Sequence, residues 1–186
     1  MATWSAIAAG EYDPDSPITT GLVGKIIDNP LAEKKWARKT GDQTITNDNS
    51  LGSDTDLTLT VVGGQTWMFA GALYVVTDSA PDFQFSIATP DTGNDDGAVY
   101  FDDAFRNDGD GLTLAAAPLA LNTAAEILFD GGGDGSGVIQ FHGFVQLDAT
   151  PTSGALAVAW AQNTSDGNNT TLKEDSYLYA VRLDPA

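Results

Sequence analysis

The sequence lacks cysteine, has a single histidine, carries few cations and contains no long apolar run. Without cysteine there can be no disulfide, thiol nucleophile or thiolate metal site. No apolar run reaches the roughly eighteen residues of a membrane span, and no basic segment followed by an apolar one indicates a secretory signal. No serine stands in a G-x-S-x-G motif that the lone His142 could serve. We therefore expect no catalytic residues, no cofactor and no enzyme.

The scarcity of cations is the second informative absence. The chain has 26 acidic and 8 basic residues, a net charge of −18, and beyond residue 43 only three basic residues accompany twenty acidic ones. Binding to phosphates requires clustered Lys and Arg, so nucleic acid and anionic membranes are excluded as partners. Two interpretations of the acidity remain open: solubility or a salt-rich environment, and weak cation binding by Asp-rich loops.

Two loops bear on that second interpretation. Asp130–Gly137 resembles calcium-binding glycine repeats but occurs once, and Asn107–Gly111 resembles an EF-hand loop without its final Glu or flanking helices. Solvated hairpin turns explain both loops. We predict no metal site.

The segment Gly64–Thr89 organises the rest of the chain. From Trp67 onward, alternate residues fall on opposite faces of an extended strand, and both faces are apolar, which predicts a long strand buried on both sides. After a proline-containing turn, Phe83, Phe85 and Ile87 share one face, which predicts a half-buried strand running back antiparallel to the first.

Beyond residue 43, short alternating runs are separated by clusters of Gly, Asn and Asp, a pattern typical of an all-β sandwich or barrel. The expected strands are Gln43–Thr46, Leu57–Val62, Thr66–Thr77, Asp82–Thr89, Ala98–Asp102, Leu112–Ala115, Glu126–Asp130, Gly137–Leu147, Ala155–Gln162 and Ser176–Leu183. In the run that contains His142, this residue shares a face with Phe144 and two glutamines, so we interpret it as structural or interfacial.

Residues 1–42 form a different region, an N-terminal arm. Ser16 and Pro17 predict the start of one short helix, which Asn29 and Pro30 end. The arm cannot bury its apolar residues on itself, so they pack either on the chain's own domain or, the interpretation we favour, on a neighbouring subunit. The predicted anchoring residues are Trp4, Ile18, Leu22, Ile26 and Trp36.

Two sets of residues resemble known families. In the arm, the segments are Trp4–Ile7, Gly10–Glu11, Asp15–Thr19 and Asp28–Ala32; they resemble the N-terminal segment of small phage structural proteins, often labelled tail fibre or virion protein. In the domain, the segments are Thr66–Tyr74, Pro81–Phe85, Trp160–Thr164 and Ser176–Leu183; they resemble phage variants of the jelly roll shared with C1q and tumour necrosis factor.

The resemblance implies a jelly-roll β-sandwich over residues 43–186 and a homotrimer with a buried threefold axis, near which we expect Phe144, Tyr177 and Tyr179. It also implies location on a virion, with capsid or tail proteins as further partners. A compact domain on a short tether favours a capsid decoration protein or short head fibre, since no shaft is present. The alternative is a tail fibre or receptor-binding protein for host attachment, acting through loop tips at Asp91–Gly97, Asn107–Gly111 and Ser165–Asn169. The missing signal peptide disfavours a secreted adhesin.

Overall fold

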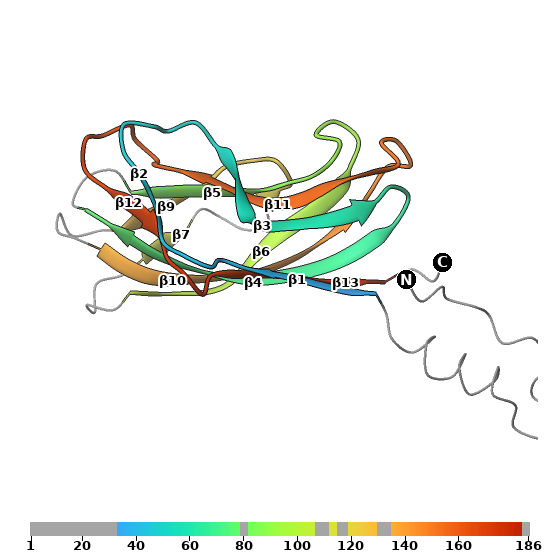
Figure 1. The fold of residues 1–186 in the computed structure, drawn as a ribbon, viewed down its shortest axis with the longest axis horizontal. Helices are drawn as coiled ribbons and strands as arrows, with labels where there is room; N and C mark the ends of the chain where they lie inside the picture. The colour runs from blue at the N-terminus through green and yellow to red at the C-terminus, as the bar shows by residue number, and fades with distance from the viewer. Residues whose placement is uncertain (1–32, 79–81, 107–111, 115–118, 130–134, 184–186) are drawn as a thin grey trace, which may run out of the picture.

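The computed structural model describes residues 33–78, 82–106, 112–114, 119–129 and 135–183. All regular structure in these ranges is β-strand, arranged as two layered antiparallel sheets (Figure 1). The all-β prediction is thereby confirmed. The predicted helix and its residues Ile18, Leu22 and Ile26 lie outside the described residues, as does Trp4.

Eight strands form the larger sheet and five the smaller one. The main path of the larger sheet is β1 (Lys34–Arg38), β13 (Tyr177–Arg182), β4 (Thr66–Thr77), β10 (Gly135–Gln146), β6 (Asp96–Arg106) and β8 (Leu119–Ala120), while β12 (Thr170–Leu172) pairs with β4 and with β2 (Gln43–Ile45). The smaller sheet runs β3 (Gly52–Val62), β11 (Ser153–Ala161), β5 (Phe83–Ala88), β9 (Ala125–Phe129) and β7 (Leu112–Leu114).

The connectivity is that of a jelly roll. Taking β1, β3, β4, β5, β9, β10, β11 and β13 in order, the first pairs with the last, the second with the seventh, the third with the sixth and the fourth with the fifth, all antiparallel. A long hairpin folded over in this way places alternate pairs in two facing sheets. The expected jelly-roll sandwich is therefore confirmed from its own topology.

The predicted hairpin within Gly64–Thr89 is wrong in its pairing. Strand β4 pairs with β10, β12 and β13 in the larger sheet, whereas β5 pairs with β9 and β11 in the smaller one. Because the two strands lie in opposite sheets, the Phe83 face of β5 and the Trp67 face of β4 both point toward a common core. Phe83, Phe85 and Ile87 are buried as predicted.

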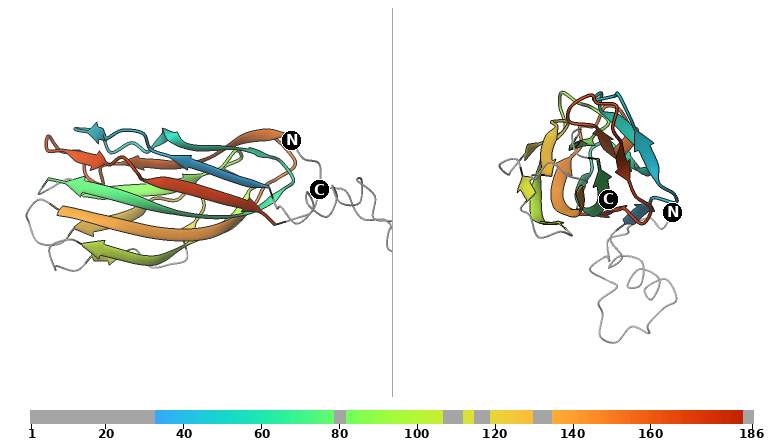
Figure 2. Two further views of the ribbon diagram at one scale, coloured as in Figure 1. Left: turned by 60° about the horizontal axis from the view of Figure 1, so that its bottom comes forward. Right: turned by 90° about the vertical axis from the view of Figure 1, so that its left-hand side faces the viewer.

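The sheet begins earlier in the chain than the predicted domain start at Gln43. Residues 34–38 form β1, which pairs with β13 from Lys34 opposite Val181 to Arg38 opposite Tyr177. Figure 2 shows β1, in blue, beside β13, in red, along one edge of the sandwich. Hydrophobic alternation hardly marks this strand, because its inward positions hold only Lys35 and Ala37. Strands β8 and β12, of two and three residues, were also missed.

Aromatic rings fill the space between the sheets. Phe83 packs on Trp160 with ring centroids 5.8 Å apart, and Phe85 on Phe141 at 5.5 Å. Gly143 allows this packing, since a Cβ there would lie 2.2 Å from the Ala98 carbonyl oxygen and 2.4 Å from the Phe69 ring. The inner side of the larger sheet is therefore fully packed against the core, so any surface of this sheet that binds a partner must lie on its outer side or along its edges.

Candidate functional site

Strand β4 departs from its sequence prediction in a way that points to a functional surface. Its inner residues Trp67 and Leu73 are fully buried, but on the other face Met68 is 45%, Tyr74 38% and Val76 36% exposed. The prediction that β4 is buried on both sides is therefore wrong within a single chain. An apolar strand face in the middle of a sheet is left open to solvent.

The neighbouring strands extend this surface, which we call the uncharged face. It consists of outward positions on β13, β4 and β10 that contain no Asp, Glu, Lys or Arg, although 18% of the chain is charged. Its members are Tyr177, Tyr179, Val181, Met68, Ala70, Ala72, Tyr74, Val76, Val138, Gln140, His142, Phe144 and Gln146. Exposed apolar area of this kind commonly marks an interaction site.

The three residues predicted near a trimer axis all lie on the uncharged face. Phe144, on β10, is 44% exposed, and Tyr177, on β13, is 42% exposed; Tyr179 lies beside Tyr177 on the same strand and is half-buried. Strand β4 separates them, so the sheet brings together residues far apart in the sequence. Their role in a trimer stays a prediction.

The single histidine belongs to the same face. His142 is exposed and lies opposite Ala70 of β4 and Tyr100 of β6, and its ring stacks on that of Tyr100 with centroids 5.4 Å apart and planes 13° from parallel. The interfacial interpretation of His142 fits this position on the uncharged face.

At the margin of the uncharged face, β1 carries Trp36. This side chain is 71% exposed, the largest value among the large apolar side chains of the described residues. Exposed Lys34 and Arg38 flank it on the same side of the strand. Sequence reasoning placed Trp36 in an arm outside the domain, whereas it projects from an edge strand. Its predicted anchoring role is untested.

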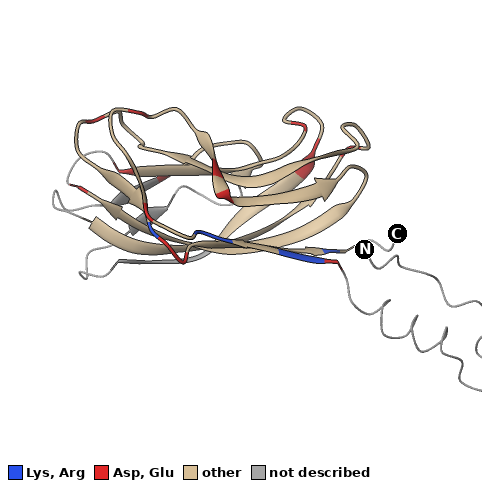
Figure 3. Cartoon of the chain, in the orientation of Figure 1, with Lys and Arg blue, Asp and Glu red and all other residues tan. Residues whose placement is uncertain are grey.

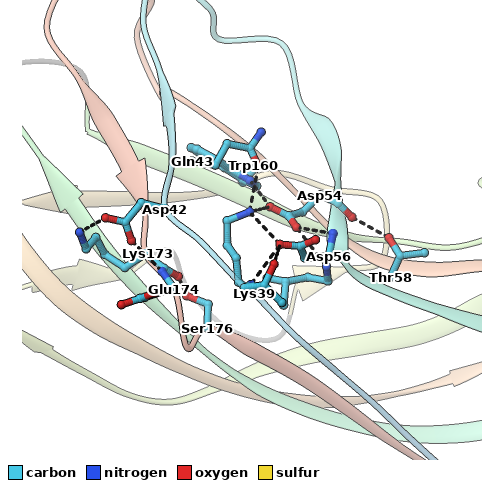
Figure 4. A network of polar contacts seen from close by, with 12 residues as sticks. Lys39, Asp42, Gln43, Asp54, Asp56, Thr58, Trp160, Lys173, Glu174 and Ser176 are labelled. Atoms are coloured by element: carbon cyan, nitrogen blue, oxygen red, sulfur yellow. Dashed lines mark hydrogen bonds and ion pairs between the residues drawn. The ribbon is translucent and has the colours of Figure 1, made fainter.

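A buried ion pair fixes the end of β1 (Figure 4). Lys39 is 2% exposed and its Nζ donates to Asp54 Oδ2 at 2.7 Å and to Gln43 Oε1 at 2.9 Å. Trp160 Nε1 donates to the same carboxylate oxygen at 3.1 Å. Since Asp54 belongs to β3, this pair joins the residue after β1 to the smaller sheet and holds the edge strand in place.

The protonation state of Asp54 follows from these donors. Burial by itself would raise the pKa of the carboxyl, but hydrogen bonds from Lys39, the Leu57 amide and Trp160 stabilise the charged form and bring the pKa below its ordinary value. Asp54 is therefore ionised at neutral pH, and its charge is matched by Lys39. No sequence motif indicated this pair.

Most of the described cations lie toward one side of the larger sheet. Six of the seven Lys and Arg residues in the described ranges lie on β1 or β13, just after β1 or just after β12 (Figure 3): Lys34, Lys35, Arg38, Lys39, Lys173 and Arg182. The seventh, Arg106, ends β6. Several of the six form ion pairs, including Arg38 with Asp175 and Lys173 with Asp42. The hydrogen bond from Lys173 lowers the pKa of the Asp42 carboxyl.

The Asp-rich loops give no metal centre within the described ranges, where no group of three or more His, Asp or Glu could hold an ion. In the loop at Asp91–Gly97, the Asn94 side chain and the Gly93 amide donate to Asp91, and the Asn94 hydrogen bond leads in lowering the pKa of that carboxyl. The loop at Asn107–Gly111 and most of Asp130–Gly137 lie outside the described residues. In the part of the chain described, no helix could cross a membrane.

A polar cluster forms the tip of the sandwich opposite the entry of the chain (Figure 1). Gln162 is fully buried, and its Oε1 accepts from the Asp48 and Asp166 amides while its Nε2 donates to the Asn168 carbonyl at 2.7 Å. The loop between β2 and β3, which contains Asp48, and the loop that follows Gln162 are thereby held together.

Comparisons with known proteins add little. No protein-family model matches the sequence, and no curated protein matches it significantly. Among solved structures, the chain is similar to Eiger TNF from S. frugiperda, with a TM-score of 0.45 and 12% identity over 84% of this chain and 95% of that one. A likeness of this extent assigns no function.

Proposed function

We propose that this protein is a structural subunit of a bacteriophage particle that assembles as a homotrimer through the uncharged face. The observation that carries the self-association is the outer side of β4, which is apolar in sequence yet exposed in the single chain. A second protein surface would complete its burial.

Charge favours a second copy of the chain as the partner. Two molecules of net charge −18 repel each other, so a contact between copies is least unfavourable where no carboxylates are brought together, and the uncharged face meets that condition. The three strands of the uncharged face, spaced about 4.8 Å apart with a rise of about 3.4 Å per residue, give roughly 400 Å² of flat area, about half of the ~800 Å² that each partner contributes to a standard interface. Burial of apolar area contributes about 25 cal/mol per Å² before ordering costs.

Attachment to a particle rests on the arm's resemblance to phage structural proteins. The described chain begins at Glu33, whose carbonyl accepts from the Arg182 amide, so its first residue lies at the end of the sandwich where the described chain also finishes. We propose that Trp4, Ile18, Leu22 and Ile26 fasten the arm to the particle. A capsid decoration protein or short head fibre fits a compact domain without a shaft.

Three measurements test this proposal. Light scattering of the full chain should give the mass of three copies, and a monomer at all concentrations would contradict the self-association. Quantitative protein analysis of purified particles should give hundreds of copies for a decoration protein and a handful for a tail component. Deletion of residues 1–32 should abolish incorporation; normal incorporation would contradict the anchoring role.

The second candidate is host attachment as a tail fibre or receptor-binding protein. The polar tip held by Gln162 favours it, since it lies at the end remote from Glu33 and presents ordered loop backbone. Substituting the exposed Ser165 and Asn168 should then reduce particle adsorption to host cells while leaving particle assembly intact.

A further inference from the structure

The proposed homotrimer constrains which surfaces can meet. A contact between two equal patches closes as a dimer, so a ring of three copies needs two different patches on each copy. The uncharged face over β4 and β10 supplies one. The other must be apolar and must lie at a margin of the same sheet if the sheets are to surround a common axis.

Trp36 marks that second patch. Its strand β1 forms one margin of the larger sheet and has only β13 beside it within that sheet. The indole is 71% exposed, whereas a tryptophan of a free subunit gains by burying its large apolar surface. The buried pair of Lys39 with Asp54 holds the end of β1 in place, so the side chain is presented from a fixed backbone.

Strand register shows where this side chain would arrive on the next copy. Trp36 lies opposite Tyr179, Tyr179 opposite Ala70, Ala70 opposite His142, and His142 opposite Tyr100. All five residues therefore occupy one level across the sheet, from β1 at one margin to β6, beyond which only the two-residue strand β8 pairs, at Ala98 and Val99. Rotation about an axis parallel to the strands preserves this level, so the β1 margin of one copy meets the β6 side of its neighbour at the same row.

We infer that Trp36 of one copy packs on the stacked His142 and Tyr100 rings of the next copy, a contact that rests on the homotrimer proposed above. The two rings stand nearly parallel on the outer side of β10 and β6, toward the end of the sheet remote from β1. An indole against such a pair gains aromatic contact beyond the burial of area.

The charges on β1 and β6 favour a contact between these two strands over a contact between the β1 strands of two copies. Trp36 is flanked by Lys34 and Arg38, so two β1 edges brought together would place cations against cations. On β6, near the opposite margin, Asp96 is exposed and lies opposite Gln146, two residues along β6 from Ala98, which shares a row with Lys34. A contact of β1 with β6 thus brings opposite charges close.

A double-mutant cycle on the full chain tests the contact. Within one copy, β1 and β6 are separated by four strand spacings, roughly 19 Å, so Trp36 and Tyr100 cannot touch there. Trp36→Ala and Tyr100→Ala should each raise the trimer dissociation constant on the order of tenfold, and the double variant should be little weaker than either single one. Mass photometry over a dilution series provides the constants.

The controls separate this contact from self-association itself. Leu51→Ala, at an exposed loop position, should leave dissociation unchanged, and thermal melting of each diluted variant should match that of the wild-type monomer. If Tyr100→Ala fails that melting check, the cycle is run with His142→Ala instead. If the wild type is a trimer but the effects of the two single variants multiply in the double variant, this contact is overturned while the proposed trimer stands. A wild-type chain that remains monomeric overturns the proposed trimer together with it.

Discussion

The outer faces of the two sheets have the same alternating pattern but carry different side chains. On the smaller sheet, the outward positions hold small or polar residues such as Thr58, Thr60, Gln84, Ser86 and Ala155. On the larger sheet, they hold tyrosine, phenylalanine, methionine and valine, with exposed fractions of 36–45% at five of these side chains.

The difference in outward side chains shows that the outer face of the smaller sheet is the one suited to contact with water. Short side chains on the smaller sheet leave little apolar area to hydrate, so that face is stable as a free surface. The uncharged face instead exposes large apolar groups on a protein whose net charge is −18. We attribute the contrast to two surroundings: solvent on one side of the sandwich and another protein surface on the other.

The largest expected effect comes from breaking the link between the sheets. Asp54→Asn removes the buried counter-charge of the Lys39 ammonium and leaves only the partly exposed Asp56, 4.0 Å from Nζ. This loss should lower the free energy of unfolding by about 3 kcal/mol. Urea denaturation measures this change. The control combines Lys39→Met with Asp54→Asn and removes both charges, so its loss should be clearly smaller. Equal losses would show that the ion pair contributes nothing specific.

Next in size is a charge placed on each face in turn. Phe144→Glu puts a carboxylate on the uncharged face and should weaken self-association by about 100-fold or more, because burying an unpaired charge is costly. The matched change Thr60→Glu on the smaller sheet should have no effect on association. Size-exclusion chromatography with light scattering measures both variants, and equal behaviour would remove the distinction between the faces.

Alternation in the sequence predicted most strands and the inward residues of the core, because one strand face must be apolar wherever a sheet covers a core. It failed at β1, where an edge strand needs little inward apolar area and the inward Ala37 gives almost no signal. It also failed on which strands pair, since Phe83 and Trp67 face the same core from opposite sheets. Pairing depends on connections across the whole chain that no local pattern contains.

The candidate site could be predicted only in part from the sequence, for a related reason. The apolar residues of β4 were recognised, but periodicity cannot tell burial within a chain from burial between chains. Phe144, Tyr177 and Tyr179 came from the resemblance, and the structure places them on one face. The stacking of His142 on Tyr100 had no signal, because it depends on the register of β10 with β6.

Acid pH should weaken the link between the sheets without a substitution. The pKa of Asp54 lies below its ordinary value of 3.8 in the folded protein, so its stabilising contribution is complete above that value and is lost as the pH falls through the lower folded pKa. The free energy of unfolding should therefore decline more steeply below about pH 4 in the wild type than in Asp54→Asn. Denaturation series at several pH values measure the two slopes. Parallel slopes would mean that other carboxyls account for the acid sensitivity.

The smallest effect provides the closest comparison of the two faces. Met68 and Val62 are exposed to similar extents, 45% and 39%, but lie on the larger and the smaller sheet respectively. Met68→Ala should weaken self-association by a few-fold, since it removes apolar area that the second copy would cover, at about 25 cal/mol per Å². Val62→Ala should leave association unchanged, and both should alter monomer unfolding by less than about 0.5 kcal/mol. Analytical ultracentrifugation resolves so small a difference. Because the two substitutions affect the fold equally little, a difference between their association constants shows which face meets the partner. Equal association constants for Met68→Ala and Val62→Ala would place the interface elsewhere.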